Sequence, residues 1–428
     1  MDPVFDAQYL PLKDKFSEEN IKIAVAYTPA GEVDHIYAVG QLLVVNTDDN
    51  INRLWQTLDR PPHNKPRYRE LDGNLVVFSL EDLEEEHFTV PEFLDRTQER
   101  LGDDFLASDT REPLAAPVHV LHTAKVCAAA EPTGPGGSPL PWPPVPGNRA
   151  DQNLVRLVIS DTGLLQDFQP GNLDVDRYRW LEGVNGDPRE DPLGRVLPRG
   201  LPGVPEEGEW RSIPFEAGHG TFVAGVARSM APRASVYVGN HFTMTGGALE
   251  YEVTRGLEEL IGNQEPHVVN VPAGGYTRKD LPPLSFSDFH RRHEDITLVA
   301  AAGNDSTDRP FWPAAFDWAI GVGALGADEQ NLAYFSNHGG WVNVYALGEG
   351  LVNAYATGVY TYHEPPKRPT QQVFRGVARW DGTSFASALV SGLIVAEIAR
   401  GGGPARDAAT RVLDAARVIR GVGRYAAS

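Results

Sequence analysis

Ser384 stands at the start of an apolar run, within the segment D-G-T-S-F-A-S-A that covers residues 381–388. The run that follows it is predicted to form a buried helix over about 384–400. A hydroxyl at a helix N-terminus lies beside unpaired backbone N–H groups and the positive end of the helix dipole, which together stabilise an oxyanion. A lone serine there is more commonly an N-cap, so nucleophilic chemistry requires a base, an orienting acid and a second oxyanion donor elsewhere in the chain.

Three further residues provide those groups. Asp161 ends a short apolar strand in L-V-I-S-D-T-G, His219 lies between two glycines in G-H-G-T-F-V-A-G, and Asn304 ends a second apolar strand in T-L-V-A-A-A-G-N. Taken singly, they would be interpreted as a turn aspartate, a capping histidine and a turn asparagine. Taken together with Ser384, they can form a catalytic set.

The chemistry assigns each residue a role. His219 is the side chain of the four that exchanges a proton near neutral pH, so it would activate the Ser384 hydroxyl. Asp161 would orient the imidazole and stabilise its protonated form. The Asn304 amide and the Ser384 backbone N–H would bind the oxyanion.

The four strings S-D-T-G, G-H-G-T-x-V-A-G, A-A-A-G-N and G-T-S-x-A-S occur in this order. Over about residues 154–420 the chain resembles the subtilisin-like serine proteases (the subtilases, peptidase family S8), whose triad also runs Asp, His, Ser. The resemblance implies a serine endopeptidase that acts on polypeptide substrates through an acyl-enzyme, without a cofactor. One alternative is a restricted peptide-maturation or regulatory protease gated by its N-terminal domain, and another is a catalytically silent peptide-binding protein.

The resemblance also implies substrate contacts, position by position. One wall of the cleft, which would pair with an extended substrate, comprises Gly246, Gly247 and Ala248. The opposite wall comprises Ala273 and Gly274, and the pocket for the side chain before the scissile bond is expected to be lined by Ala301, Ala302 and Gly303. Asp305 is expected either to favour Lys or Arg in that pocket or to be a surface residue.

Several positions depart from the family pattern. Ala388 stands where proline is usual, and Pro272 replaces a residue whose N–H is commonly available to substrate. Only residues 226–230 lie between Ala224-Gly225 and Ala231-Pro232, which leaves no room for the insertion that holds calcium in many secreted subtilases. We expect no metal ion at this place.

Alternating segments predict an α/β fold, with a parallel sheet covered by helices on both faces in the peptidase domain. Strands are expected near 154–160, 234–239, 267–272, 296–302, 317–323 and 342–346, and helices near 219–230, 248–262, 384–400 and 405–418. The domains are predicted at 1–128 (a small α/β domain), 129–150 (a Pro/Gly-rich linker, accessible to proteolysis between about 128 and 150) and 151–428 (a subtilisin-like three-layer peptidase domain).

The N-terminal region reads β-α-β-α-β, with strands at 41–46, 74–80 and 118–126 and helices at 48–58 and 90–101. It carries 25 acidic and 13 basic residues over positions 1–150, so −12 of the net charge of −20 lies there. The domain is expected to be propeptide-like, an intramolecular inhibitor or folding chaperone, or else an independent binding or targeting domain.

Composition limits the remaining classes of function. The net charge of −20 disfavours nucleic-acid binding, and no apolar run is expected to reach membrane-spanning length. The single cysteine, Cys127, excludes an intramolecular disulfide and is expected to be a packed residue of a strand. With no secretory signal visible at the start, these features predict a cytoplasmic protein.

Overall fold

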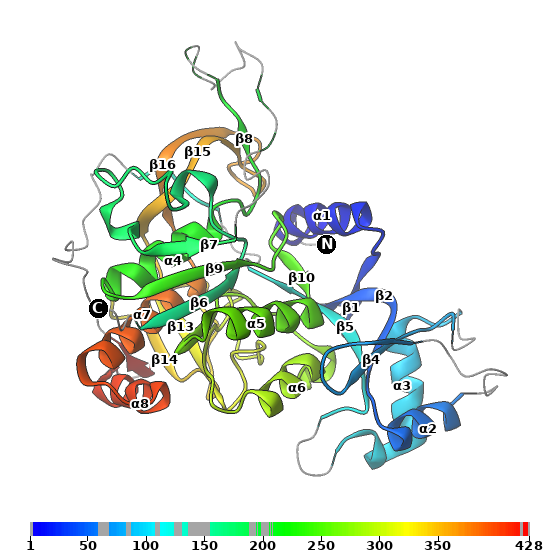
Figure 1. The fold of residues 1–428 in the computed structure, drawn as a ribbon. Coiled ribbons are helices and arrows are strands. Elements are labelled where there is room, and N and C mark those ends of the chain that lie inside the picture. Colours follow the sequence, from blue (N-terminus) through cyan, green and yellow to red (C-terminus); the bar gives the residue numbers. More distant parts are fainter. Residues whose placement is uncertain are drawn as a thin grey trace.

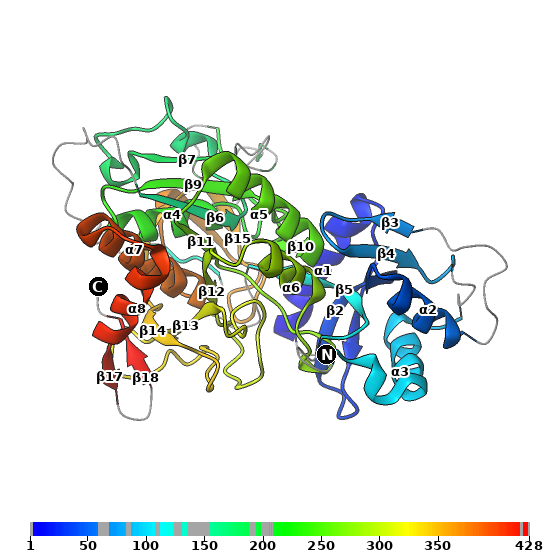
Figure 2. The same ribbon diagram turned by 60° about the horizontal axis from the view of Figure 1, so that its bottom comes forward.

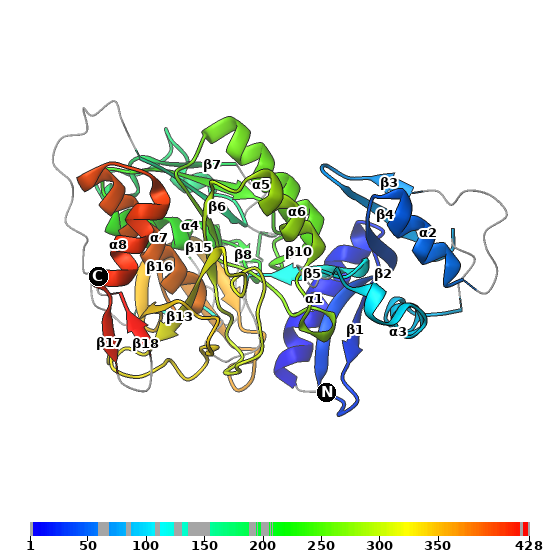
Figure 3. The same cartoon turned by 90° about the horizontal axis from the view of Figure 1, so that it is seen from below.

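The computed structural model describes residues 3–58, 68–82, 87–107, 112–123, 131–135, 155–187, 194, 196–197, 205, 207, 209–419 and 423–426. An N-terminal unit, blue to cyan in Figures 1 and 3, lies beside a larger body coloured green to red. Cys127 lies outside the described residues, as does most of the predicted linker.

The N-terminal unit is an antiparallel sheet with the order β5-β2-β4-β3, and β1 pairs with β2. Its elements are α1 (Pro3–Glu18), β1 (Ile23–Tyr27), β2 (Val33–Val45), α2 (Asp48–Gln56), β3 (Tyr68–Glu70), β4 (Leu75–Ser79), α3 (Val90–Leu101) and β5 (Ala115–His122). The predicted β-α-β-α-β order is confirmed by β2, α2, β4, α3 and β5. The pattern did not predict α1, β1 or β3.

Alternation along the strands produces two apolar faces in this unit. Leu42 and Val44 pack in one cluster with α2 and α3, whereas Leu43 packs in another with Leu12 and Phe16 of α1. Both helices that cover the first face begin at a threonine cap, because the Thr47 hydroxyl accepts from Asn50 N–H and Thr89 forms a capping box with Glu92.

The larger body is built on a nine-stranded sheet with the order β17-β18-β14-β13-β12-β11-β6-β9-β7. The strands are β6 (Arg156–Asp161), β7 (Val184–Gly186), β9 (Ser235–Asn240), β11 (Val268–Val271), β12 (Thr297–Ala301), β13 (Ala319–Leu325), β14 (Val344–Leu347), β17 (Arg417–Ile419) and β18 (Gly423–Tyr425). Across the sheet, every neighbouring pair of strands in the order β18-β14-β13-β12-β11-β6-β9-β7 is parallel. The six predicted strands correspond to β6, β9 and β11 to β14.

Helices cover both faces of this sheet (Figure 2). Leu157 and Ile159 pack in one cluster with α4 (His219–Met230), α7 (Thr383–Gly401) and α8 (Ala405–Ala415). Val158 faces the other way and packs in a second cluster with α5 (Glu250–Gln264) and α6 (Leu284–Arg292). The expected three-layer α/β architecture is thus present, with α6 as an unpredicted helix.

The helix α7 lies in the middle of this core. It is 19 residues long, and by length and composition alone it is apolar enough to cross a membrane, which corrects the expectation that no segment would reach that length. About two thirds of this apolar stretch (67%) is buried inside the protein. The helix is apolar because it packs against other elements on most of its circumference.

A long hairpin also escaped prediction. It consists of β15 (Leu351–Thr361) and β16 (Gln371–Trp380), with β8 (Ser212–Ile213) added to β15. A short part of the predicted linker is fixed to it, because Thr133 and Arg379 exchange two backbone hydrogen bonds of 2.8 and 2.9 Å. The buried Glu131 carboxylate accepts from His363 N–H at 2.6 Å. This part of the linker thus forms an isolated β-bridge with the hairpin.

Candidate active site

The carboxyl end of β6 brings Asp161 to the first turn of α4. Asp161 is fully buried, and each of its carboxylate oxygens lies 2.9 Å from His219 Nδ1. Close approach of the helix requires Gly220, because a Cβ there would lie 2.7 Å from the carbonyl oxygen of Gly163 and 3.1 Å from Asp161 Oδ1. Gly218 caps the helix with a φ of 90°, in the left-handed region that glycine tolerates.

His219 is enclosed by aromatic rings. Trp380 at the end of β16 lies edge-on at 5.4 Å between ring centroids, and Phe385 of α7 lies at 5.5 Å. This burial lowers the pKa of His219, but the Asp161 carboxylate opposes it, and the net effect raises the pKa above its usual value. The pair therefore holds an imidazole whose Nδ1 is bonded to a carboxylate, as a general base requires.

Ser384 lies in the first turn of α7 and is 3% exposed. Its hydroxyl is within hydrogen-bonding distance of two backbone carbonyl oxygens, 2.8 Å from that of Pro272 and 3.2 Å from that of Thr123. Among the described residues, these carbonyls are its partners in this conformation, and His219 is not one of them. The Asp–His link of the predicted triad is formed, and the Ser–His link is not.

Asn304 lies beside the start of α7. Its Oδ1 accepts from the backbone N–H of Thr383 at 2.9 Å and from the Thr383 hydroxyl at 2.8 Å. Because Thr383 engages the oxygen, the amide nitrogen of Asn304 is left as the donor. Together with the N–H groups of the first helical turn, this places two kinds of donor close to Ser384.

The end of the N-terminal sheet occupies the adjoining cleft. The strand β5 pairs antiparallel with β10 (Gly247–Leu249), so that Gly247 lies opposite His122 and Ala248 opposite Leu121. On its other side, His122 exchanges two backbone hydrogen bonds with Gly274, of 2.9 and 3.0 Å. In Figure 1, β5 can be followed from the N-terminal unit to β10.

The residues expected to contact substrate thus contact the chain itself. Gly246 accepts from Thr123 N–H at 2.8 Å, which completes the wall of Gly246, Gly247 and Ala248. A small pocket next to Ser384 is lined by Ala273, Ala301, Gly303, Asn304, Phe311, Thr383, His122 and Thr123. Ala302 and Asp305 are not among its lining residues. The Asp305 carboxylate accepts from the Tyr276 hydroxyl at 2.7 Å, and Ala302 N–H donates to Val322 of β13.

Several known proteins that resemble this chain are subtilisin-like proteases. The Subtilase family (Peptidase_S8) matches residues 201–401, which include His219, Asn304 and Ser384. We call the larger body, which holds this matched stretch, the subtilase domain. Subtilisin-like protease PopC of Myxococcus xanthus is 30% identical over 201 residues, which are 41% of this chain and 40% of PopC. Thermitase of Thermoactinomyces vulgaris is 26% identical over 218 residues, 49% of this chain and 70% of thermitase.

The matches do not extend over whole proteins. The aligned part spans only 23% of a further relative, the minor extracellular protease Epr of Bacillus subtilis. Among solved structures, a mutant of the protease domain of PatA has a TM-score of 0.47 and 22% identity, with 64% of this chain and 92% of that domain covered.

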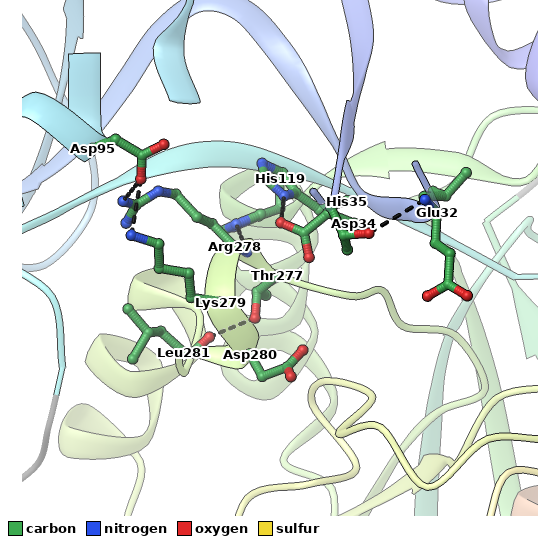
Figure 4. A network of polar contacts seen from close by, with 12 residues as sticks. Glu32, Asp34, His35, Asp95, His119, Thr277, Arg278, Lys279, Asp280 and Leu281 are labelled. Atoms are coloured by element: carbon green, nitrogen blue, oxygen red, sulfur yellow. Dashed lines mark hydrogen bonds and ion pairs between the residues drawn. The ribbon is translucent and has the colours of Figure 1, made fainter. Parts of the chain in front are cut away.

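The N-terminal unit is held on the subtilase domain by complementary charges. Figure 4 shows Arg278 and Lys279 directed at Asp95 of α3, with N···O distances of 2.5 and 2.8 Å. Arg309 reaches Asp34 of β2 at 2.5 Å. The cations come from the subtilase domain and the carboxylates from the acidic N-terminal unit.

A buried polar contact joins the same two parts. His119 of β5 lies 2.7 Å from the Glu250 carboxylate at the start of α5, and its Nε2 accepts from Arg278 N–H at 3.2 Å. The pKa of Glu250 is lowered: burial raises it, but His119 outweighs that effect. This contact fixes β5 immediately before it enters the cleft.

Sequence reasoning missed three residues of the site. Thr383 positions Asn304, Glu216 lies three residues before His219 with its side chain against Thr123, and Thr123 itself contacts Ser384. Thr383 lies within the G-T-S-x-A-S string and Glu216 lies three residues before His219, so their neighbourhood was visible in the sequence. Nothing in the sequence singled out Thr123, because its role depends on where β5 docks.

Proposed function

We propose that the chain is a serine endopeptidase. The observation that supports this most directly is the buried Asp161–His219 pair beside Ser384, in a cleft that already binds an extended strand between two walls. Ser384 Oγ would attack the carbonyl carbon of a substrate bound in place of β5. His219 Nε2 would accept the hydroxyl proton, and Asn304 would donate to the oxyanion.

The acyl-enzyme then follows from the same set of groups. His219, protonated and stabilised by Asp161, would return the proton to the leaving amine as the peptide bond breaks. A water molecule, deprotonated in turn by His219, would hydrolyse the ester at Ser384. Because Nδ1 is held by Asp161, the opposite nitrogen of the ring serves as base and acid in both steps.

We propose further that the N-terminal domain inhibits this site in cis. Its strand β5 pairs with both walls, and the carbonyl oxygen of Thr123, the residue after β5, lies 3.2 Å from the Ser384 hydroxyl whose proton His219 would accept. Release of β5 would free the walls for a substrate and remove the Thr123 carbonyl, so that Ser384 has only to leave the Pro272 carbonyl oxygen to turn toward His219. A role of the domain as a folding chaperone stays a prediction, as does cleavage between about residues 128 and 150, which lies outside the described positions apart from 131–135.

A fluorophosphonate probe tests the mechanism on the full chain. Wild type and the matched control Ser391→Ala, a buried serine in the same helix, should be labelled, whereas Ser384→Ala should not. Equal labelling of Ser384→Ala would contradict the proposal. Absence of labelling in wild type, and also in an Asp95→Lys variant with a weakened domain contact, would favour the catalytically silent peptide-binding alternative.

Restriction to a few substrates and a cytoplasmic location are also proposals. Of the relatives matched, Epr is named an extracellular protease. Cell fractionation with an antibody against the chain would decide the location directly.

A further inference from the structure

Thr123 occupies a defined subsite of the cleft. It is 4% exposed, and its N–H donates to Gly246 while its carbonyl oxygen lies 3.2 Å from Ser384 Oγ. Its side chain fills a narrow space between Gly246 and Glu216. A Cβ on Gly246 would collide with Thr123 Oγ1 and lie 2.8 Å from Glu216 Cγ. The space therefore takes a small side chain.

Glu216 forms the polar wall of this subsite. Its backbone is fixed, because its N–H donates to Met244 and its carbonyl accepts from His219 N–H. One carboxyl oxygen, Oε2, accepts from the Thr123 hydroxyl at 3.4 Å, and the other, Oε1, is buried without any hydrogen-bond partner among the described residues. Within that part of the chain, Thr123 is the side chain that donates to this carboxyl group.

We infer that Glu216 selects the residue of a bound peptide that takes the place of Thr123, favouring a small side chain with a hydroxyl group, Thr or Ser, over an apolar or acidic one. The inference rests on the proposed function of the cleft. A valine of the same shape would leave both oxygens of a buried carboxyl group without a partner, which costs binding. For the same reason, binding sites that form a hydrogen bond with a hydroxyl group reject analogues that lack this group.

The electrostatic environment of Glu216 favours an uncharged hydroxyl group on the bound peptide over a carboxylate. Burial raises the pKa of Glu216 to about 8, His219 lowers it, and Asp161 and Glu364 raise it. Near neutral pH the group is therefore mainly a carboxylic acid, which both donates and accepts a hydrogen bond. An aspartate in place of Thr123 would bury a carboxylate in a region where Asp161 already contributes negative charge.

The first test uses β5 itself as the bound peptide and requires no catalysis. In the full chain carrying Ser384→Ala, hydrogen exchange would be measured at the amides of His122 and Thr123, which donate to the two walls. Thr123→Val should lower their protection about tenfold or more, because loss of the hydroxyl leaves Glu216 Oε2 buried without its partner, and a tenfold loss corresponds to about 1.4 kcal/mol. In a Glu216→Leu background the same change should have almost no effect. Thr297→Val, at a buried threonine that begins β12 inside the subtilase domain, is the matched control and should leave protection of β5 unchanged.

The second test uses separate peptides with the full chain. Peptides of the sequence Val-Leu-His-X-Ala-Lys, with Thr, Ser, Val or Asp at X, would be compared by kcat/KM. Thr and Ser should exceed Val by about ten- to a hundredfold, Asp should be the poorest, and Glu216→Leu should bring the Thr to Val ratio close to one.

Equal protection of β5 with and without the Thr123→Val change, or a Thr to Val ratio that persists in Glu216→Leu, would overturn the inference. Failure of the proposed function looks different, because peptides would then be cleaved by neither chain, or equally by wild type and Ser384→Ala. The exchange measurements would still decide the role of Glu216 in that case.

Discussion

The interior of the subtilase domain and its contact with the N-terminal domain are built from different interactions. Within the sheet, every residue of β11 and β12 is buried, and the helices on both faces contribute mainly apolar side chains. The domain contact has an apolar part around Leu12 and Phe16, but it also depends on ion pairs such as Arg278–Asp95, in which the Asp95 side chain is 52% exposed. Partly exposed ion pairs contribute about 0–1 kcal/mol each and are screened by salt.

This difference separates two tasks. Apolar packing fixes Asp161, His219, Asn304 and Ser384 at the ends of strands and helices, where a small displacement would be costly. The domain contact holds β5 in the cleft with interactions that solvent, salt and pH can weaken. The catalytic residues, which must stay in place, and the N-terminal domain with β5, which must leave the cleft, are thereby stabilised in different ways. We call this domain, with β5 in the cleft, the cover.

The largest expected effect concerns the interior. Ser384→Ala should reduce peptidase activity by roughly four to six orders of magnitude, because the nucleophile is lost and the remaining groups act only with it. Hydrolysis of a fluorogenic peptide by wild type and variant measures the change, and circular dichroism checks the fold. A residual rate within tenfold of wild type would show that the interior does not carry the chemistry.

The next effect concerns Asn304. Removing an oxyanion donor typically lowers kcat by about 10²–10³, so Asn304→Ala should lower kcat on that scale while changing KM little. Thr383→Val is a useful companion, because it removes the hydroxyl that holds Asn304 Oδ1 and should give a smaller loss. A change in KM alone, with kcat intact, would argue against an oxyanion role.

A pH-dependent effect links the interior with the cover. The pKa of Glu216 is about 8 in the folded chain against about 4.5 in an unfolded one, so folding retains a proton that unfolding releases. The contribution of Glu216 to the free energy of unfolding is therefore fully present below about pH 4.5 and is lost as the pH rises to about 8. At about 1.4 kcal/mol per pKa unit, the loss should amount to a few kcal/mol.

Urea unfolding of the Ser384→Ala chain at several pH values would measure this loss. Glu216→Gln should flatten the curve, while Glu364→Gln should flatten it less, because the pKa of Glu364 is raised only to about 7 by burial. His219, whose pKa is also raised, acts in the same direction and is common to all three chains. An unchanged slope in Glu216→Gln would contradict the assignment.

The smallest expected effect concerns a single ion pair. Asp95→Lys should weaken the domain contact by about 1 kcal/mol, somewhat more than loss of an exposed pair, because it places like charges together. Peptidase activity of the full chain should then rise up to about tenfold, and the difference from wild type should shrink in 1 M salt. Asp103→Lys, in the same domain but with no ion pair to the subtilase domain among the described residues, is the matched control. Equal activity of Asp95→Lys and wild type at low salt would show that charge does not hold the cover.

The local sequence was sufficient for the elements that carry the site. The six predicted strands, β6, β9 and β11 to β14, are apolar runs that end at turn residues, and α4 and α7 begin at glycine-flanked motifs. Hydrophobic periodicity and turn residues were therefore enough to locate them. The long hairpin β15–β16, the first helix α1 and the helix α6 were missed, since their stability comes from partners far along the chain. The predicted pocket positions Ala302 and Asp305 likewise depended on loop geometry that spacing does not define.

By itself, the sequence determined which side chains are available for chemistry and on which elements they stand, because those properties are local. Only the tertiary structure decided what occupies the cleft. The contact of Ser384 with Thr123 joins residues 261 positions apart, and that of Glu216 with Thr123 joins residues 93 apart. Such contacts follow from how β5 docks on β10 and Gly274, which is set by the packing and charge of two whole surfaces and leaves no periodic trace in either segment.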